Sequence, residues 1–217
     1  MSEVKSAVPS VNTRVFYSKT GRAKYISHLD LNHCIQRAIM RAKLPVWQTQ
    51  GFNPHMYISF ALPLSLGQEG LREALDFRTT EDISFDEIAQ RLNAALPPDI
   101  RVTEVAQPVH KVTEIGSAEY LVESEIDIES FVGFLQRDEI IVEKTTKKGT
   151  ASIDIKPHIN LVSADKSGIS ARFPCGNEFS VNPELLVSAY EKAENIEIKY
   201  LRIVRTHTFC TDGSEFR

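Results

Sequence analysis

The chain has 217 residues, of which 42% are hydrophobic and 25% are charged, a composition typical of a globular protein with one large or two small domains. No apolar run approaches the roughly 20 residues of a membrane span, and the polar start lacks the apolar core of a signal peptide, so we expect a cytoplasmic protein. The three cysteines are widely spaced, which favours neither a disulfide framework nor a cysteine-held metal or iron–sulfur site.

The charge is unevenly distributed along the chain. The net charge is -4, but residues 1–67 hold eight basic residues against two acidic ones, a net charge of +6, which leaves about -10 for the rest. A basic segment on an acidic protein suits one localised anionic partner, such as an RNA backbone or a phosphorylated ligand, better than a general polyanion.

The first part of the chain predicts a tail, a strand and a helix. Residues 1–12 are polar and predict a flexible tail, and residues 14–18 alternate as a strand does before a basic turn. Ser27 followed by Asp30 is a capping box that predicts a helix start, and Pro45 ends the helix because its ring prevents continuation. An apolar stripe should pack this helix on a sheet: Leu31, Cys34, Ile35, Ala38 and Ala42.

Another side of the same helix is charged. Asp30, His33, Arg37 and Arg41 fall together at about 100° per residue. One interpretation is an ordinary solvated face. The other is a column of donors, His33, Arg37 and Arg41, suited to phosphate or carboxylate.

The sequence GFNPH at residues 51–55 predicts a sharp bend that presents His55. Gly51 can adopt a positive φ, and Pro54 fixes the next dihedral angle. The alternative is a structural loop with an incidental histidine. Residues 56–62 then predict a buried strand. We expect the helix and this bend to form a single cationic recess for an anion.

The remaining elements predict an α+β protein of two tandem ferredoxin-like units with antiparallel sheets. The order strand, helix, strand, strand, helix, strand is the split βαβ plan, and it recurs in the second half. We expect a flexible tail over residues 1–12 and domains over residues 13–109 and 117–217. The further predicted strands are residues 74–78, 100–105, 118–123, 140–144, 153–162 with a break at Pro157, 169–173 and 198–208, and the further helices begin near residues 84, 128 and 182.

Five motifs stand out: SHLDL at residues 27–31, GFNPH at 51–55, ISFALPL at 58–64, DIKPHI at 154–159 and RTHTFCTDG at 205–213. They resemble the radical-SAM-linked protein family, an uncharacterised bacterial-type family whose domain is often encoded beside, or fused behind, a radical-SAM protein with a cobalamin-type binding domain. The resemblance implies a radical-SAM partner and no established reaction. Met56 departs from the pattern, because a second proline is usual there. The chain has no CxxxCxxC motif, so radical-SAM chemistry would belong to the partner.

The leading hypothesis is an RNA-binding or RNA-modification accessory protein. One alternative is an RNA-processing or RNA-modifying enzyme that uses histidine and aspartate for acid–base chemistry; another is a protein-interaction module without nucleic acid.

We expect no cofactor and no metal site, since His28 and His33 would point about 140° apart on a helix. The catalytic candidates are His33, His55, Asp76 and Asp154, with His28 as a further histidine. The anion-binding or RNA-binding candidates are Arg22, Lys24, His33, Arg37, Arg41, Phe52, Asn53 and His55, with Lys147 and Lys148 for phosphates and Trp47 and Tyr57 for stacking.

Overall fold

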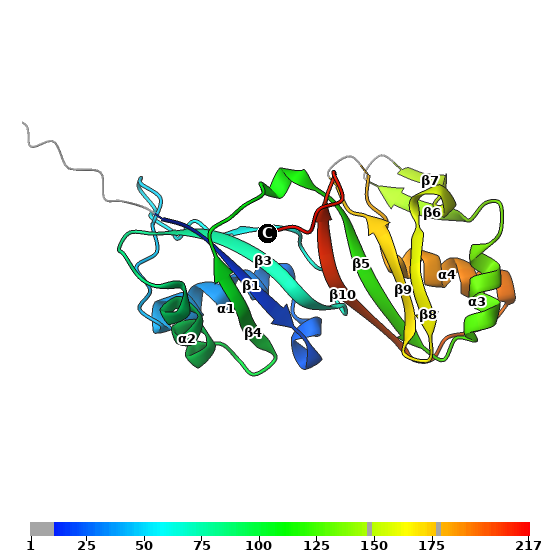
Figure 1. Cartoon of the computed structure of the whole chain (residues 1–217), viewed down its shortest axis with the longest axis horizontal. Helices are drawn as coiled ribbons and strands as arrows, with labels where there is room; N and C mark the ends of the chain where they lie inside the picture. Colours follow the sequence, from blue (N-terminus) through cyan, green and yellow to red (C-terminus); the bar gives the residue numbers. More distant parts are fainter. Residues whose placement is uncertain (1–10, 147–148, 177–178) are drawn as a thin grey trace, which may run out of the picture. The chain divides into compact units, whose positions relative to one another are not determined.

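Figure 1 shows a computed structural model of the chain, which describes residues 11–146, 149–176 and 179–217. These residues form two compact units: the first comprises the chain up to Val112 together with Arg217, and the second is Thr113–Phe216. Both are mixed α+β structures with antiparallel sheets. Of the predicted tail, residues 1–10 lie outside the described residues, whereas Val11 and Asn12 already belong to a strand.

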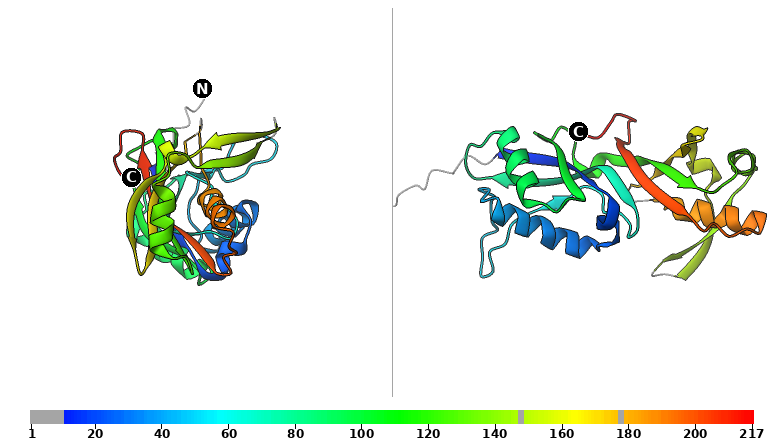
Figure 2. Two further views of the ribbon diagram at one scale, coloured as in Figure 1. Left: turned by 90° about the vertical axis from the view of Figure 1, so that its right-hand side faces the viewer. Right: turned by 90° about the horizontal axis from the view of Figure 1, so that it is seen from below.

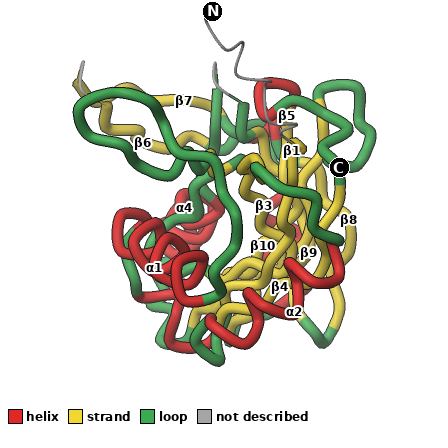
Figure 3. Tube along the Cα trace, turned by 90° about the vertical axis from the view of Figure 1, so that its left-hand side faces the viewer, coloured by secondary structure: helices red, strands yellow, loops and turns green. Residues whose placement is uncertain are grey.

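The first unit alternates strands and helices. Its sheet has the order β4-β1-β3, with the short β2 paired to β3, and every pair is antiparallel. The elements, of which α1, α2, β1, β3 and β4 are labelled in Figure 3, follow in chain order. They are β1 (Val11–Lys19), η1 (Gly21–Tyr25), α1 (His28–Arg41), β2 (Ser59–Phe60), β3 (Glu69–Thr79), α2 (Phe85–Ala95) and β4 (Ile100–Ala106), followed by η2 (Val112–Glu114).

Both helices of the first unit begin at a capping serine. Ser27 Oγ accepts a hydrogen bond from the main-chain N–H of Asp30 (3.1 Å) and donates one to the Asp30 carboxylate (2.7 Å). The predicted start of α1 is therefore confirmed. In α2, Ser84 Oγ accepts from the N–H of Glu87 (3.2 Å). Each cap satisfies a donor that has no partner within the helix.

The core of the first unit lies between its helices and one face of its sheet. Val15 and Tyr17 of β1 pack with Leu75 and Phe77 of β3 in one apolar cluster with the two helices. Since successive strand residues point to opposite faces, the residues between them project from the helix-free face. The predicted stripe of α1 largely enters the core: Leu31, Ile35 and Ala38 are buried together with Ile39, while Cys34 and Ala42 are half-buried against them.

The predicted buried strand over residues 56–62 is wrong in length and burial. Only Ser59–Phe60 pairs with β3, and Tyr57 is exposed. The reason is that the preceding loop folds back on itself. Gln48 and Met56 form an isolated bridge, and the N–H of Thr49 donates to the carbonyl of His55 (2.8 Å).

The second unit has a sheet of order β10-β5-β9-β8 and a separate hairpin of β6 and β7, all antiparallel. The predicted break at Pro157 is confirmed, because η3 separates β7 from β8. Its elements are β5 (Ile115–Ser124), α3 (Ile128–Leu135), β6 (Ile141–Thr146), β7 (Gly149–Asp154), η3 (Lys156–His158), β8 (Asn160–Asp165), β9 (Gly168–Pro174), α4 (Pro183–Glu194) and β10 (Leu201–Cys210).

Aromatic side chains hold the two helices of the second unit together. The ring of Tyr190 in α4 lies 4.9 Å from that of Phe131 and 5.5 Å from that of Phe134, measured between centroids. The Tyr190 hydroxyl donates to Ser130 Oγ (2.9 Å), so the polar end of this buried ring is satisfied. As predicted, α4 begins near residue 182; Asn182 is its cap and Pro183 lies in its first turn.

None of the helices among the described residues is long and apolar enough to cross a membrane.

Candidate anion-binding site

Polar residues of three strands meet on the helix-free face of the first unit. In the β1–β3 register Arg14 lies opposite Asp76 and Asn12 lies opposite Arg78, and in the β2–β3 register Ser59 also lies opposite Asp76. Residues directly opposite each other in a sheet project from the same face. The strand register therefore gathers two arginines, a carboxylate, an amide and a hydroxyl into one patch.

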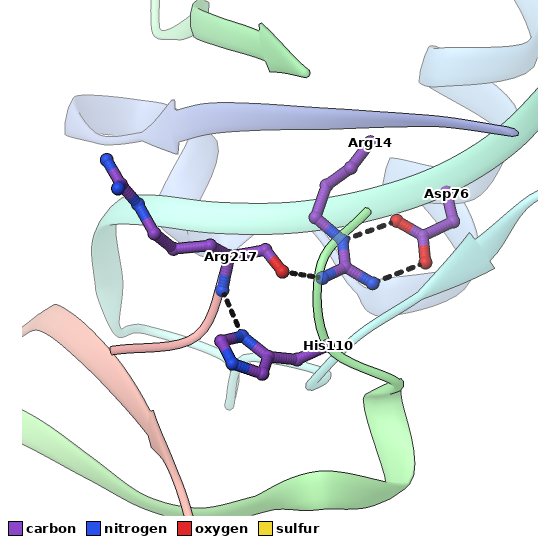
Figure 4. A network of polar contacts seen from close by, with 4 residues as sticks. All are labelled: Arg14, Asp76, His110 and Arg217. Atoms are coloured by element: carbon purple, nitrogen blue, oxygen red, sulfur yellow. Dashed lines mark hydrogen bonds and ion pairs between the residues drawn. The ribbon is translucent and has the colours of Figure 1, made fainter. Parts of the chain in front are cut away.

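Arg14 and Asp76 form the base of this patch (Figure 4). Arg14 Nε and Nη2 each donate to one oxygen of Asp76 at 2.7 Å. The Arg14 side chain is only 1% exposed, against 24% for Asp76. Such a two-point pair is among the strongest charged contacts in proteins, so both oxygens of Asp76 are engaged and its charge is compensated.

The main chain of Arg217 covers the other side of the Arg14 guanidinium. Its main-chain oxygen accepts from Arg14 Nη1 (2.8 Å) and from the N–H groups of Val109 (3.0 Å) and His110 (2.8 Å). The N–H of Arg217 donates to His110 Nδ1 (3.1 Å) (Figure 4). Because Nδ1 accepts this bond, the neutral imidazole carries its proton on Nε2.

A pocket of about 290 Å³ opens over this patch. The segment that precedes Val112 forms its other wall. Arg78, Lys111 and Tyr57 are exposed, whereas Arg14 is buried at the base. Together Arg14, Arg78, Lys111 and Asp76 give the lining a net charge of +2. The lining residues are Asn12, Arg14, Tyr57, Ser59, Asp76, Phe77, Arg78, Pro108, His110, Lys111 and Val112.

The predicted basic column of α1 is exposed, and none of its residues lines this pocket. His33, Arg37 and Arg41 all face solvent, although Arg41 Nη2 also donates to the carbonyl of Ala95 in α2 (2.7 Å). Burial raises the pKa of the neighbouring Cys34 thiol, while the charges of Arg41 and Arg37 act to lower it. Both guanidinium groups are therefore close enough to Cys34 to influence its ionisation.

The bend after α1 projects its predicted residues into solvent. Phe52 is fully exposed, and Asn53 and His55 are exposed as well. Gly51 adopts a φ of 144°, so the predicted positive φ is confirmed. His55 Nδ1 lies 3.0 Å from Thr49 Oγ1 and 3.2 Å from the carbonyl of Asn53. The imidazole is thus held by its own loop.

The basic residues before α1 have local contacts. Arg22 is exposed, and its main-chain N–H donates to Asp99 Oδ2 (3.1 Å). Lys24 Nζ lies 3.6 Å from Glu69 Oε1 and 5.2 Å from the centroid of the Tyr25 ring. The charge of Lys24 is therefore partly compensated. The predicted phosphate contacts Lys147 and Lys148 lie outside the described residues.

The carboxylates proposed for catalysis both have structural partners. Asp76 is engaged by Arg14, as described above. Asp154, which lies in the second unit, uses Oδ1 to accept from the N–H groups of Ile140 (2.9 Å) and Lys156 (3.0 Å). His28 packs edge-on against Phe60 at 4.8 Å between centroids. Among the residues that the structure describes, no group of three or more histidine, cysteine or acidic side chains is arranged to hold a metal ion.

Our sequence reasoning missed most of the pocket. It named Asp76 as a catalytic candidate and Tyr57 as a stacking residue, but assigned no role in a site to Arg14, Arg78 or Lys111. A signal was present: Arg14 and Asp76 are opposite charges inside two apolar strands. Strands that the ferredoxin-like plan places side by side would bring such charges together.

Comparisons with known proteins give a family and little else. A family model described as "Uncharacterized protein conserved in bacteria (DUF2344)" matches residues 12–191. No curated protein matches the chain. Among solved structures, the chain is similar to an unknown protein from Galdieria sulphuraria, with 14% sequence identity over 89% of this chain and 98% of that one and a TM-score of 0.28. A TM-score this low supports no inference about fold or function.

Proposed function

The chain belongs to this uncharacterised bacterial family, and from that premise we propose that it is an RNA-binding accessory protein that binds RNA through its first unit. The observation that carries the proposal is the exposed basic face of α1, together with the fully exposed Phe52 of the loop that follows this helix. Figure 2 shows this loop projecting beside the C-terminal end of α1. Single-stranded RNA is bound by cations that follow its backbone and aromatic rings that stack on its bases.

The cationic side chains are placed for contact with a backbone. Arg37 and Arg41 are four residues apart and therefore follow one side of α1, about 6 Å apart along its axis. Their planar guanidinium groups match the geometry of phosphate oxygens. His33 extends the same row by one turn. The arrangement supplies several positive contacts in one line.

The two units differ in charge. The first carries 14 basic and 11 acidic residues, whereas the second carries 11 basic and 18 acidic ones. An RNA backbone is attracted to a net positive surface and repelled by a negative one. The charge difference therefore favours the first unit as the binding unit and leaves the second for another task, such as contact with a partner protein.

A binding titration with matched charge reversals tests the proposal. Fluorescence anisotropy with single-stranded RNA at moderate salt compares the wild type with Arg37→Glu/Arg41→Glu. The control is Arg91→Glu/Arg101→Glu, because both arginines are exposed in the same unit. Arg101 resembles Arg41 in that it donates to a main-chain carbonyl of α2, in this case that of Asn93. We expect the α1 reversal to weaken binding at least about tenfold and to lower the salt dependence by about two contacts.

Equal losses in both double variants would show that only net charge matters, and the α1 surface would then be rejected. The resemblance noted in the sequence implies a radical-SAM protein as the partner of the RNA-binding chain. A different outcome would be that RNA does not bind, whereas such a protein co-purifies with the wild type and not with the Arg37→Glu/Arg41→Glu variant. The α1 surface would then be a protein-interaction site, and the RNA proposal would be wrong.

Acid–base catalysis on RNA has less support. Asp76 and Asp154 accept hydrogen bonds from Arg14 and from main-chain N–H groups, respectively, and His55 is held by its own loop. These contacts give each group a structural task. Binding without turnover is the function that the described contacts favour.

We also propose that the units are tandem ferredoxin-like domains, within residues 13–109 and 117–217. In the first unit the strand order β4-β1-β3-β2, with α1 after β1 and α2 after β3, supports this plan. In the second, the order β10-β5-β9-β8 supports the same plan, with the β6–β7 hairpin inserted after α3.

A further inference from the structure

We propose that the pocket on the helix-free face of the first unit holds one unpaired base of the bound RNA and selects a base with an exocyclic amino group. This inference rests on the proposed RNA binding and deepens it, because it assigns base recognition to a pocket that no residue of α1 lines. Adenine, cytosine and guanine carry such an amino group, whereas uracil carries a carbonyl oxygen where cytosine has its amino group.

The pocket has a size and a mixed lining that suit a single base. Its volume is about 290 Å³, close to the lower limit of roughly 300–1,000 Å³ for small-molecule sites. Pro108, Val112 and the Tyr57 ring supply apolar surface. Asn12 and Ser59 supply an amide and a hydroxyl. A base is divided in the same way, because its faces stack on aromatic rings and its edge carries hydrogen-bond donors and acceptors.

Tyr57 is placed to stack on a base in this pocket. Its side chain is exposed, and its ring lies 6.4 Å from the Trp47 ring at an interplanar angle of 70°. Such an edge-to-face contact covers at most one face of the Tyr57 ring. The N–H of Tyr57 donates to the carbonyl of Trp47 (3.5 Å), whose own N–H donates to the carbonyl of Arg78 in β3 (2.8 Å). The main chain that carries the ring is therefore anchored to the sheet.

Asp76 determines which base edge fits. Arg14 donates one hydrogen bond to each of its oxygens (2.7 Å), so neither oxygen carries a proton and both can only accept. Each carboxylate oxygen has about two lone-pair sites, which leaves a further acceptor site on each. The Asp76 side chain is 24% exposed and lines the pocket. The amino group of cytosine would donate to it, whereas O4 of uracil would bring a second acceptor against it.

Exposed groups of the lining complete the contact with the nucleotide. Arg78 and Asn12 lie opposite each other in the β1–β3 register, and both are exposed. The guanidinium of Arg78 matches phosphate oxygens, so it can contact the phosphodiester beside the bound base. Tyr57 follows Phe52 by five residues, which span at most about 18 Å. One short single-stranded RNA can therefore stack on both rings.

Fluorescence anisotropy of the full-length protein with oligocytidylate and oligouridylate of equal length tests the selection. The two RNAs carry the same charge and differ only at the base edge. At moderate salt we expect oligocytidylate to bind at least about tenfold more tightly, because the donor that Asp76 accepts is missing in uracil.

Variants locate the selection in the pocket. Tyr57→Leu should bring the ratio of the two affinities close to one, because a base that is not stacked no longer presents its edge to Asp76. Arg78→Ala should weaken both RNAs about equally and keep the ratio, as loss of a phosphate contact does. Tyr25→Leu is the control, since Tyr25 is an exposed tyrosine of the same unit outside the lining, and it should keep the ratio.

Equal affinities of the wild type for the two RNAs, a ratio that survives Tyr57→Leu, or an equal loss of the ratio in Tyr25→Leu would overturn the proposal. RNA binding that depends on Arg37 and Arg41 but shows no preference would overturn this inference and leave the proposed function intact. A protein that binds neither RNA would overturn both.

Discussion

Arg14 and Asp76 face each other across β1 and β3 and are joined by two hydrogen bonds of 2.7 Å. The pair lies on the sheet face opposite the main apolar core, yet the Arg14 side chain is only 1% exposed. Removal of one partner would leave the other charge with little water to solvate it. Because the pair also forms the base of the pocket, breaking it should both destabilise the first unit and alter the pocket.

Replacement of Arg14 by methionine should destabilise the protein by about 3 kcal/mol, because a broken buried pair leaves an uncompensated charge. Urea denaturation measures the change. The double variant Arg14→Met/Asp76→Leu is the control, since replacing both partners by apolar residues is often close to neutral. A double variant no more stable than Arg14→Met would contradict this account of the pair.

Phe52→Ala should weaken RNA binding without affecting folding. The side chain is fully exposed, so the free energy of unfolding should change by no more than about 0.5 kcal/mol. The loss of one stacked base should cost about 1–3 kcal/mol of binding. Thermal denaturation and RNA titration on the same samples separate the two effects. In contrast, Phe77→Ala removes a ring that is 2% exposed and should cost about 3–5 kcal/mol of stability.

The reactivity of Cys34 should report the positions of two arginines. Burial raises the pKa of its thiol, and the charges of Arg41 and Arg37 oppose that effect. Arg41→Ala should therefore raise the pKa further, reduce the thiolate fraction and slow alkylation by iodoacetamide. Mass spectrometry of the Cys34 peptide measures the rate against pH. Arg91→Ala is the matched control, and an equal change in both variants would argue against a local effect of Arg41.

Cys175 should make the protein less stable at alkaline pH. Burial raises the pKa of its thiol to about 11 from 9.0, so the folded protein retains a proton that the unfolded chain loses. The stabilising contribution is complete below about pH 9 and is lost as the pH rises towards 11. The loss should amount to about 3 kcal/mol at most. Denaturation of the wild type and Cys175→Ala across this range measures it; parallel pH profiles would show that Cys175 does not contribute.

Local signals in the sequence predicted the elements well, whereas the site depended on pairings that those signals do not contain. Ser27 and Ser84 mark helix starts because a capping side chain acts on an N–H only three residues away. The strand predicted over residues 56–62 is wrong because their apolar character suits a strand, but the main chain before Ser59 pairs with its own loop.

The pocket was harder to predict because its residues come from distant parts of the chain. Asn12 meets Arg78 only through the β1–β3 register, and a shift of one residue would turn both side chains to the opposite face. The contacts of His110 with Arg217 span more than a hundred positions. Composition and spacing carry no information about such a pairing.

The self-paired loop after α1 offers an attachment point for probes. Its main chain is closed by the contacts between Gln48 and Met56 and between Thr49 and His55, while the Phe52 ring lies wholly outside the fold. A photoreactive amino acid or a fluorophore at position 52 would perturb no packed neighbour. Crosslinking from that position in living cells would covalently capture whatever molecule docks beside α1, whether nucleic acid or protein.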